Sequence, residues 1–331
     1  MSQTNVVQAL AEADFSGVAE SFTNAGFQVA LPAKGIMQIT SAAAVPDKHL
    51  RLRLLLSVGV HGDETAPIEM LAHLLQELAV TPQALQVDLM VVVGNLAAIA
   101  QGRRYLDADL NRLFTTKRGD LATVVEAERA DAIMHATEAF FGGHDGEKWH
   151  LDLHTAIRKS FYPMFAIVPD VIDERAKLKL AAWLGGAGIE AIILNSKLAP
   201  TYSAYTATQF GATSCTAELG QVGILGNNDL SQFVLTSAAI DSMLRSGDTL
   251  AFKHAMPLVF QVAQEIVKRS DSFQLTFDRS TQNFTAMEPG ALIATDSTGN
   301  YSVGTATEYV VFPNPDVRIG QRAGLMVVRR T

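Results

Sequence analysis

The sequence contains a single cysteine in 331 residues, which excludes an intramolecular disulfide and fits a reducing compartment. Cys215 is best interpreted as a small buried hydrophobic residue. No stretch approaches the roughly 20 apolar residues that a membrane-spanning helix needs, because the apolar run 85–93 is interrupted by Asp88. Residues 1–6 show no basic segment followed by an apolar one, so no signal peptide is predicted. These absences predict a soluble, cytoplasmic protein with no membrane partner.

The sequence also lacks a surplus of positive charge, with 26 Lys and Arg against 34 Asp and Glu and a net charge of −8. A nucleic-acid partner is therefore not expected, because phosphate neutralisation requires excess Lys and Arg. The apolar content of 48% and charged content of 18% are ordinary for a globular protein. The length is sufficient for a large core and indicates one large domain plus a smaller one. The sequence leaves the oligomeric state open.

Apolar runs alternate with segments of helical spacing along most of the chain. Residues 52–60 and 87–93 are nearly continuous apolar runs, as in strands that are buried on both faces. The alternation predicts an α/β fold in which helices cover a sheet. The predicted strands are 28–31, 36–39, 52–60, 87–93, 149–153, 165–168 and 191–194, and the predicted helices are 5–23, 64–78, 121–141 and 173–184.

The pattern changes near residue 270. The segment 250–269 is predicted to form one long helix, and the residues after it have the pattern of short strands separated by Gly, Pro and Asn. We therefore predict a large domain over 1–270 and a small β domain over 271–331 that packs on it. The strands expected in the small domain are 273–277, 291–294, 301–303, 308–312 and 325–329.

The residues with the clearest chemistry are two histidines and two glutamates. His61 and Glu64 form an H-x-x-E pair directly after the run 52–60, His154 ends another predicted strand, and Glu218 follows later. Two histidines and one carboxylate are a ligand set for catalytic zinc, which keeps its fourth position for water. A further glutamate that does not bind metal can be the general base. Groups at the carboxyl ends of strands in α/β sheets meet in one cleft, so the sequence predicts a zinc hydrolase.

An H-x-x-E pair alone carries little weight, because a lone histidine is more often structural than a metal ligand. The combination of strand-end placement, a second histidine and a separate glutamate is what favours a metal site. The other histidines lack this context and are interpreted as surface or core residues; they are His49, His73, His135, His144, His150 and His254.

The segment 102–114 gathers three arginines, an asparagine and two aspartates in an otherwise acidic protein. One interpretation is a solvated loop. The other is a binding site for carboxylates, because the planar donor fork of arginine matches a carboxylate in a bidentate manner. Asp109 could then hold one of these arginines in position. Arg158, four residues after His154, would add positive charge near the metal.

The motifs resemble those of the succinylglutamate desuccinylase and aspartoacylase family, a branch of the zinc carboxypeptidase superfamily. The resemblance extends from about residue 50 to the C-terminus and keeps the motif order. It is carried by the segments 61–67, 104–106 with 109–112, 151–156 and 216–220. Resemblance to the desuccinylase branch rests on 154–158, 228–230 with 232–233, 312–315 and 322–325.

The resemblance implies that His61, Glu64 and His154 ligate one zinc ion per chain and that Glu218 is the catalytic base. Asp109 would contact one of the metal ligands without binding the metal itself. The implied fold is a carboxypeptidase-like α/β domain, with a mixed sheet flanked by helices, followed by a small C-terminal β domain.

The resemblance also implies that Arg104 polarises the scissile carbonyl, that Asn111 and Arg112 hold a substrate carboxylate, and that Arg158 contacts the substrate. The implied reaction is hydrolysis of the linear amide of N-succinyl-L-glutamate, the last step of arginine catabolism by the succinyl-transfer route. This small-molecule substrate carries three carboxylates. Three alternatives stay open: an N-acyl amino acid hydrolase of the aspartoacylase type, a zinc peptidase, and a non-catalytic zinc protein.

Overall fold

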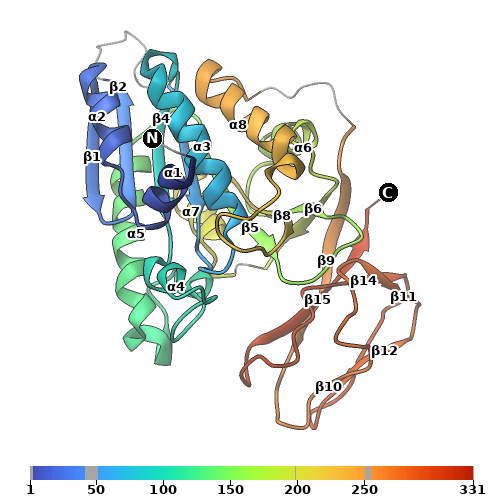
Figure 1. The fold of residues 1–331 in the computed structure, drawn as a ribbon. Coiled ribbons are helices and arrows are strands. Elements are labelled where there is room, and N and C mark those ends of the chain that lie inside the picture. The colour runs from blue at the N-terminus through green and yellow to red at the C-terminus, as the bar shows by residue number, and fades with distance from the viewer. Residues whose placement is uncertain (1–2, 42–50, 198, 250–254, 331) are drawn as a thin grey trace.

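The computed structural model describes residues 3–41, 51–197, 199–249 and 255–330 (Figure 1). Its largest element is a mixed sheet with the strand order β1-β2-β4-β3-β5-β8-β6-β7-β9-β15-β14-β11, and a smaller antiparallel sheet has the order β10-β12-β13. The strands are β1 Phe27–Ala33, β2 Ile36–Ser41, β3 Arg53–Val58, β4 Asp88–Val93, β5 Lys148–Ala156, β6 Met164–Pro169, β7 Ala191–Asn195, β8 Thr213–Gln221, β9 Leu258–Val267, β10 Gln274–Leu275, β11 Thr285–Met287, β12 Leu292–Thr295, β13 Tyr301–Ser302, β14 Glu308–Val311 and β15 Arg322–Arg329.

Helices cover both faces of the central strands. The helices α1, α2, α3, α6 and α8 contribute to the hydrophobic core on one face, α5 contributes to the core on the other, and α7 contributes to both. The predicted α/β class, with a mixed sheet flanked by helices and a small β region at the C-terminus, is confirmed. The helices are α1 Gln3–Ala11, α2 Ser16–Asn24, α3 Ala66–Val80, α4 Leu96–Ala100, α5 Val125–Phe141, α6 Glu174–Gly186, α7 Tyr202–Phe210 and α8 Val234–Ser246.

The centre of the sheet is built from three parallel neighbours, β3, β5 and β8. All residues of β4 are buried, as are all but the first residue of β3. Nearly continuous apolar runs therefore form strands whose two faces are both covered, as the sequence predicts. Because β3, β5 and β8 run in the same direction, their carboxyl ends meet at one edge of the sheet.

The predicted helix over 250–269 is wrong where the structure describes it. Residues 258–267 form β9, which pairs in parallel with β7 and in antiparallel with β15; residues 250–254 lie outside the described residues. This segment is rich in β-branched and aromatic residues, which fit a pleated surface between two neighbouring strands. The main sheet thus passes without a break into the C-terminal strands. The division into domains at residue 270 stays a prediction.

The other differences concern helix boundaries and missed elements. The predicted helix 5–23 is two helices, because Ala13 has a φ of 61° and the Asp14 side chain accepts a hydrogen bond from the Ser16 N–H at 2.9 Å. The helix expected over 121–141 begins at residue 125, after a short 3₁₀ turn, Gly119–Thr123. The sequence reasoning missed α4, α7, α8 and β11, and it did not recognise the segment around Glu218 as a strand.

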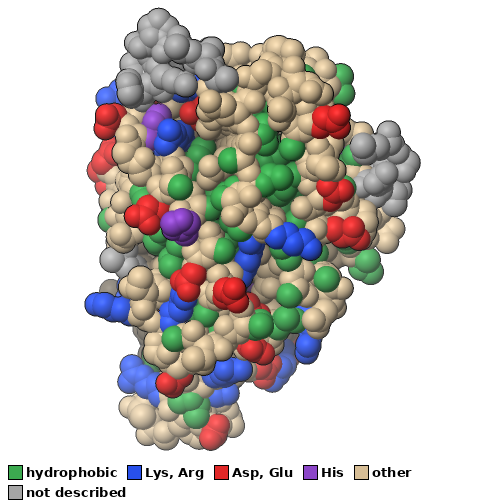
Figure 2. Space-filling view, turned by 90° about the vertical axis from the view of Figure 1, so that its left-hand side faces the viewer, with side chains coloured by type: hydrophobic (Ala, Val, Ile, Leu, Met, Phe, Trp, Pro, Cys, Tyr) green, Lys and Arg blue, Asp and Glu red, His purple; other side chains and the backbone are tan. Residues whose placement is uncertain are grey.

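The surface mixes charges of both signs. On the face that Figure 2 shows, acidic and basic side chains are interspersed, and hydrophobic side chains gather near the middle of the face. Among the described residues, no helix combines the length and the apolarity needed to cross a membrane.

Candidate metal centre and active site

The first two residues of the site lie in the tight connection between β3 and α3. His61 follows β3 by three residues, and Glu64 precedes α3. Gly62 is required between them, because a Cβ atom there would lie 2.4 Å from the carbonyl carbon of Ala98. The segment 102–114 is called the arginine-rich loop below. The Gly62 N–H donates to the Arg104 carbonyl at 3.0 Å, so the backbone of this loop is attached to the backbone beside His61.

Three buried side chains converge at the carboxyl edge of the sheet. The Nδ1 atoms of His61 and His154 lie 3.2 Å apart, at 2.8 Å and 2.7 Å from the two carboxylate oxygens of Glu64. His154 comes from β5, so the group joins the β3–α3 connection to a strand whose His154 lies 90 residues after Glu64 in sequence. His61, Glu64 and His154 form the one group with metal-ligand character among the described residues. The prediction that these three residues lie together is confirmed.

The ring nitrogens that face away from this group each contact a second carboxylate. His61 Nε2 lies 2.8 Å from Asp109 Oδ1, and His154 Nε2 lies 3.0 Å from Asp152 Oδ2. His154 and Asp152 form an ion pair without an aligned hydrogen bond, and His61 Nε2 also lies 3.2 Å from Arg104 Nη2. With a metal ion bound by the two Nδ1 lone pairs, each Nε2 would carry the ring hydrogen toward its carboxylate. Such carboxylate–histidine pairs orient the metal-binding histidines of known sites.

The resulting arrangement favours a cation. Two Nδ1 lone pairs and the Glu64 carboxylate are all acceptors, so they can lie this close only with protons or a metal ion among them. Burial lowers the pKa of His154, but Asp152 and Glu64 raise it more, so that its pKa is well above the ordinary value. Two imidazoles and one carboxylate also fit zinc, whose tetrahedral ligand atoms lie about 3.3 Å apart for bonds of about 2.0–2.1 Å. The residues therefore fit a catalytic metal.

A buried polar chain extends behind His154. The Ser57 Oγ donates to Asp152 Oδ1 at 2.6 Å and lies 2.8 Å from His150 Nε2, and His150 Nδ1 lies 2.8 Å from Thr206 Oγ1. Since the Ser57 hydroxyl gives its only hydrogen to Asp152, His150 Nε2 must donate to Ser57. Burial lowers the pKa of His150 to about 4, so the ring is neutral at neutral pH. His150 is a core residue, as interpreted from the sequence. It also supports the site, because it contacts Ser57, which in turn holds the Asp152 side chain beside His154.

Glu218 faces the same site from β8. It pairs directly with His154 in the parallel register of β5 and β8, so the two side chains project on the same face. Among the described residues, Glu218 Oε2 is buried and has no hydrogen-bond partner. Burial, reinforced by the charge of Glu64, raises the pKa of Glu218 to about 7. A carboxylate with this pKa is suited to proton transfer near neutral pH.

The arginine-rich loop forms the wall of the site. Arg104 Nη1 donates to Glu64 Oε1 at 2.7 Å, and Arg112 Nη2 lies 3.4 Å from Asp109 Oδ2. The Asn111 side chain is buried, and its carbonyl oxygen accepts the Tyr202 N–H at the start of α7 at 2.8 Å. The loop is therefore attached to the metal group at one end and to the core at the other.

Among the described residues, neither Arg103 nor Arg158 forms a hydrogen bond or ion pair with His61, Glu64 or His154, and contact of Arg158 with the substrate stays a prediction. Arg103 is exposed to solvent. Arg158 interacts electrostatically with Arg279, Asp316 and Asp278 of the C-terminal region, and burial lowers its pKa. The C-terminal region contacts the arginine-rich loop instead through Arg318, whose Nη2 donates to the Asp107 carbonyl at 3.3 Å.

The sequence reasoning missed Ser57 and Asp152 as parts of the site. Asp152 had a visible signal, because the strand 148–156 alternates apolar residues with the polar series His150, Asp152 and His154. Polar residues on one face of a buried strand indicate a partner network.

Comparison with known proteins gives consistent matches over the whole site. Residues 51–244 match the model of the succinylglutamate desuccinylase/aspartoacylase catalytic domain, and residues 256–330 match that of the AstE/AspA barrel-sandwich hybrid domain. The succinylglutamate desuccinylase of Burkholderia thailandensis is 44% identical over 281 residues, which cover 84% of this chain and 80% of that protein.

Two solved structures of the same name are also similar. The succinylglutamate desuccinylase of Chromobacterium violaceum matches with a TM-score of 0.79 and 32% identity, covering 96% of this chain and 98% of that one. That of Vibrio cholerae matches with a TM-score of 0.80 and 27% identity, covering 95% and 94%. Together with the arrangement of His61, Glu64, His154 and Glu218, these matches establish that the chain belongs to the succinylglutamate desuccinylase/aspartoacylase family.

Proposed function

We propose that this protein is a zinc-dependent amidohydrolase that cleaves N-succinyl-L-glutamate to succinate and L-glutamate. The observation that carries the proposal is the convergence of His61, Glu64 and His154, with Glu218 opposite His154 across two paired strands. The shared name of relatives that are 40–44% identical supports the choice of substrate. The reaction would be the last step of arginine catabolism by the succinyl-transfer route, in the cytoplasm.

Zinc held by His61, Glu64 and His154 would supply a Lewis acid that makes water available as a nucleophile near neutral pH. Glu218 takes a proton from the attacking water on a carboxylate oxygen. The water oxygen bonds to the amide carbon, the carbon–nitrogen bond breaks, and Glu218 gives the proton to the departing amine nitrogen. Arg104 donates hydrogen bonds to the carbonyl oxygen as negative charge develops on it.

Substrate recognition would rest on the arginine-rich loop. The substrate carries three carboxylates, and Arg112 offers a guanidinium that is more than one-third exposed beside Asn111. Arg158 is a weaker candidate, because its charge interacts with residues of the C-terminal region. No nucleic acid or membrane is expected as a partner.

The test of the substrate is a comparison of hydrolysis rates on N-succinylglutamate, N-succinylornithine, N-acetylaspartate and a short peptide. We expect the highest kcat/KM for N-succinylglutamate. Preference for N-acetylaspartate would indicate the aspartoacylase type, and preference for the peptide would indicate a peptidase. Zinc binding without any turnover would refute a catalytic role.

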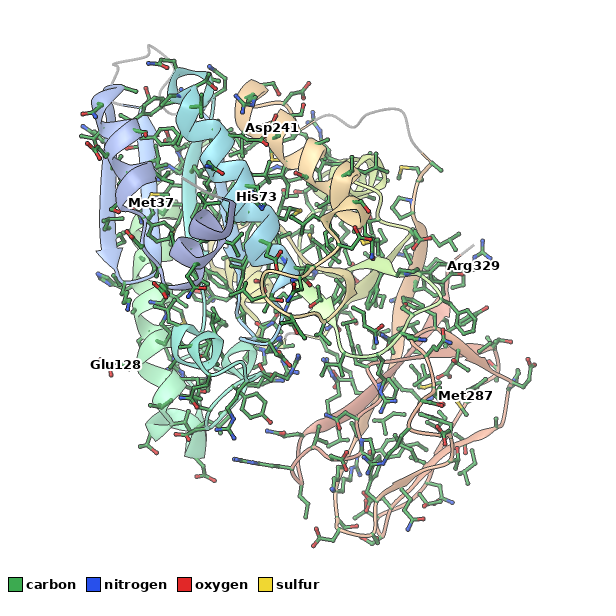
Figure 3. The ribbon with its side chains drawn as sticks, in the orientation of Figure 1. Met37, His73, Glu128, Asp241, Met287 and Arg329 are labelled. Atoms are coloured by element: carbon green, nitrogen blue, oxygen red, sulfur yellow. The ribbon has the colours of Figure 1, made fainter. Side chains whose placement is uncertain are left out.

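The test of the metal site uses the zinc content of purified variants. His61→Ala and His154→Ala should lose zinc, whereas His73→Ala, a change of a half-buried histidine on α3 (Figure 3), should keep it. Glu218→Gln keeps the shape of the side chain and removes the base, so turnover should fall by about 10²- to 10⁴-fold at full zinc content. Equal loss of zinc and activity in Glu218→Gln would make Glu218 a ligand instead.

A further inference from the structure

A second buried carboxylate, outside the metal group, lies under the arginine-rich loop. Glu126, in the first turn of α5, is 1% exposed. Its oxygens accept the backbone N–H groups of Leu106 at 2.6 Å, Asp107 at 3.2 Å and Ala108 at 3.1 Å. A fourth donor, Asn95 Nδ2, lies at 3.4 Å. The ion pairs among the described residues do not include Glu126, so these dipoles and the N-terminus of α5 compensate its charge.

The contact between the loop and the helix is reciprocal. While Glu126 binds the loop, the Asp107 side chain accepts the Val125 N–H at the start of α5 at 3.2 Å. Two acidic side chains thus each accept from the backbone of the other's segment. Such a clamp fixes the distance between the loop and α5 without using any side chain that faces the site.

The three N–H groups that Glu126 binds lie, in sequence, between two residues that contact the metal group. Arg104, on one side, donates to Glu64, and Asp109, on the other, contacts His61. The loop therefore reaches the metal group on both sides of the segment that Glu126 holds. A displacement of about 1 Å in a positioning element can cost about 10²-fold in rate.

We propose that Glu126 is a positioning residue that holds the loop 104–112 so that Arg104 and Asp109 meet the His61–Glu64 pair. It does not touch the substrate or the metal. The kinetic part of this inference rests on the proposed function, but the positioning itself does not.

The first measurement is independent of activity. In Glu126→Gln an amide nitrogen replaces one of the two acceptor oxygens, so at least one of the loop N–H groups loses its partner. Hydrogen exchange followed by mass spectrometry should therefore be faster for the peptide containing 106–108 than in wild type, with little change in the central strands. The matched control is Glu128→Gln, two residues further along α5, whose exposed side chain points away from the molecule (Figure 3). Unchanged exchange in the loop of Glu126→Gln would overturn the proposal.

The second measurement is a double-mutant cycle on N-succinylglutamate. We expect Glu126→Gln to lower kcat/KM by about 10- to 100-fold. In an Arg104→Ala background the same change should have a smaller effect, because one of the two residues that Glu126 positions is already absent and only the effect through Asp109 remains. A purely structural role would give equal effects in both backgrounds and would refute the inference.

If Glu126→Gln does not fold, the same two measurements on Glu126→Asp test the positioning role, since this variant keeps both acceptor oxygens on a shorter side chain. If the wild type does not hydrolyse N-succinylglutamate, the proposed function fails, and the hydrogen-exchange comparison alone tests the positioning.

Discussion

The neutral, buried His150 should make the stability of this protein sensitive to acid. The ring is fully buried, lies between Ser57 and Thr206, and packs edge-on against Tyr202 at a centroid distance of 4.3 Å. Burial lowers its pKa from 6.5 to about 4, and attraction to Asp152 offsets only part of this effect. In the unfolded chain the pKa returns to about 6.5.

The sign and the size follow from this difference. Because the folded pKa is the lower one, the unfolded chain takes up a proton first as the pH falls. The contribution of His150 to stability is fully present above the unfolded pKa and is lost between about pH 6.5 and pH 4. Between about pH 7.5 and about pH 5, the loss is about 2 kcal/mol.

The assay is urea unfolding of wild type and His150→Gln at both pH values, with a chelator present so that metal loss does not contribute. The variant should be less stable at the higher pH but should lose about 2 kcal/mol less on acidification. His61 and His154 have raised pKa values, so their contribution is present at low pH and lost as pH rises; it is common to both proteins and cancels. His135→Gln, at an exposed position, is the control. Equal pH dependence of wild type and His150→Gln would refute the reasoning.

Three further predictions follow from the site and the core. Asp152→Asn should weaken zinc binding by about 10- to 100-fold, measured by competition with a chromophoric chelator, because His154 loses its charged partner; unchanged affinity would contradict this. Arg112→Ala should raise KM for N-succinylglutamate by about 10- to 150-fold, whereas Arg104→Ala should mainly lower kcat; steady-state kinetics of both variants separate the two effects, and no change in either would make the loop a solvated surface feature. Phe260→Ala should lower the free energy of unfolding by about 3–5 kcal/mol, because this fully buried ring packs against residues of both the catalytic and the C-terminal strands. A urea midpoint equal to that of wild type would contradict this and show that the surrounding side chains fill the cavity without loss of stability.

The central strands could be predicted from the sequence because their apolar runs are long and local. Residues 52–60 and 87–93 contain little but apolar side chains, and both form strands that are buried on two faces. The joint position of His61, Glu64 and His154 could also be predicted, because two of them lie on one turn and the third ends a recognisable strand. Zinc ligation by these residues stays a prediction.

The segment 258–267 could not be assigned from its own residues. Its mixture of Val, Ile, Phe and Gln is compatible with a helix as well as with a strand, and the choice depends on neighbours that are distant in sequence. β7 ends more than 60 residues before this segment begins, and β15 begins more than 50 residues after it ends. The contact of Glu126 with the arginine-rich loop could not be predicted for the same reason, since no sequence pattern in the loop indicates it.

The alignment of Glu218 with His154 depends on strand register, which is a property of the core and not of the site. Side chains alternate along a strand, so a slip of one residue between β5 and β8 would turn Glu218 to the opposite face. That slip would bring Cys215, Ala217 and Leu219, all buried in the hydrophobic core on the other face, toward the polar site. The apolar side chains therefore hold Glu218, the proposed general base, in place, and a change to the packing of β8 should alter catalysis without touching a residue of the proposed active site.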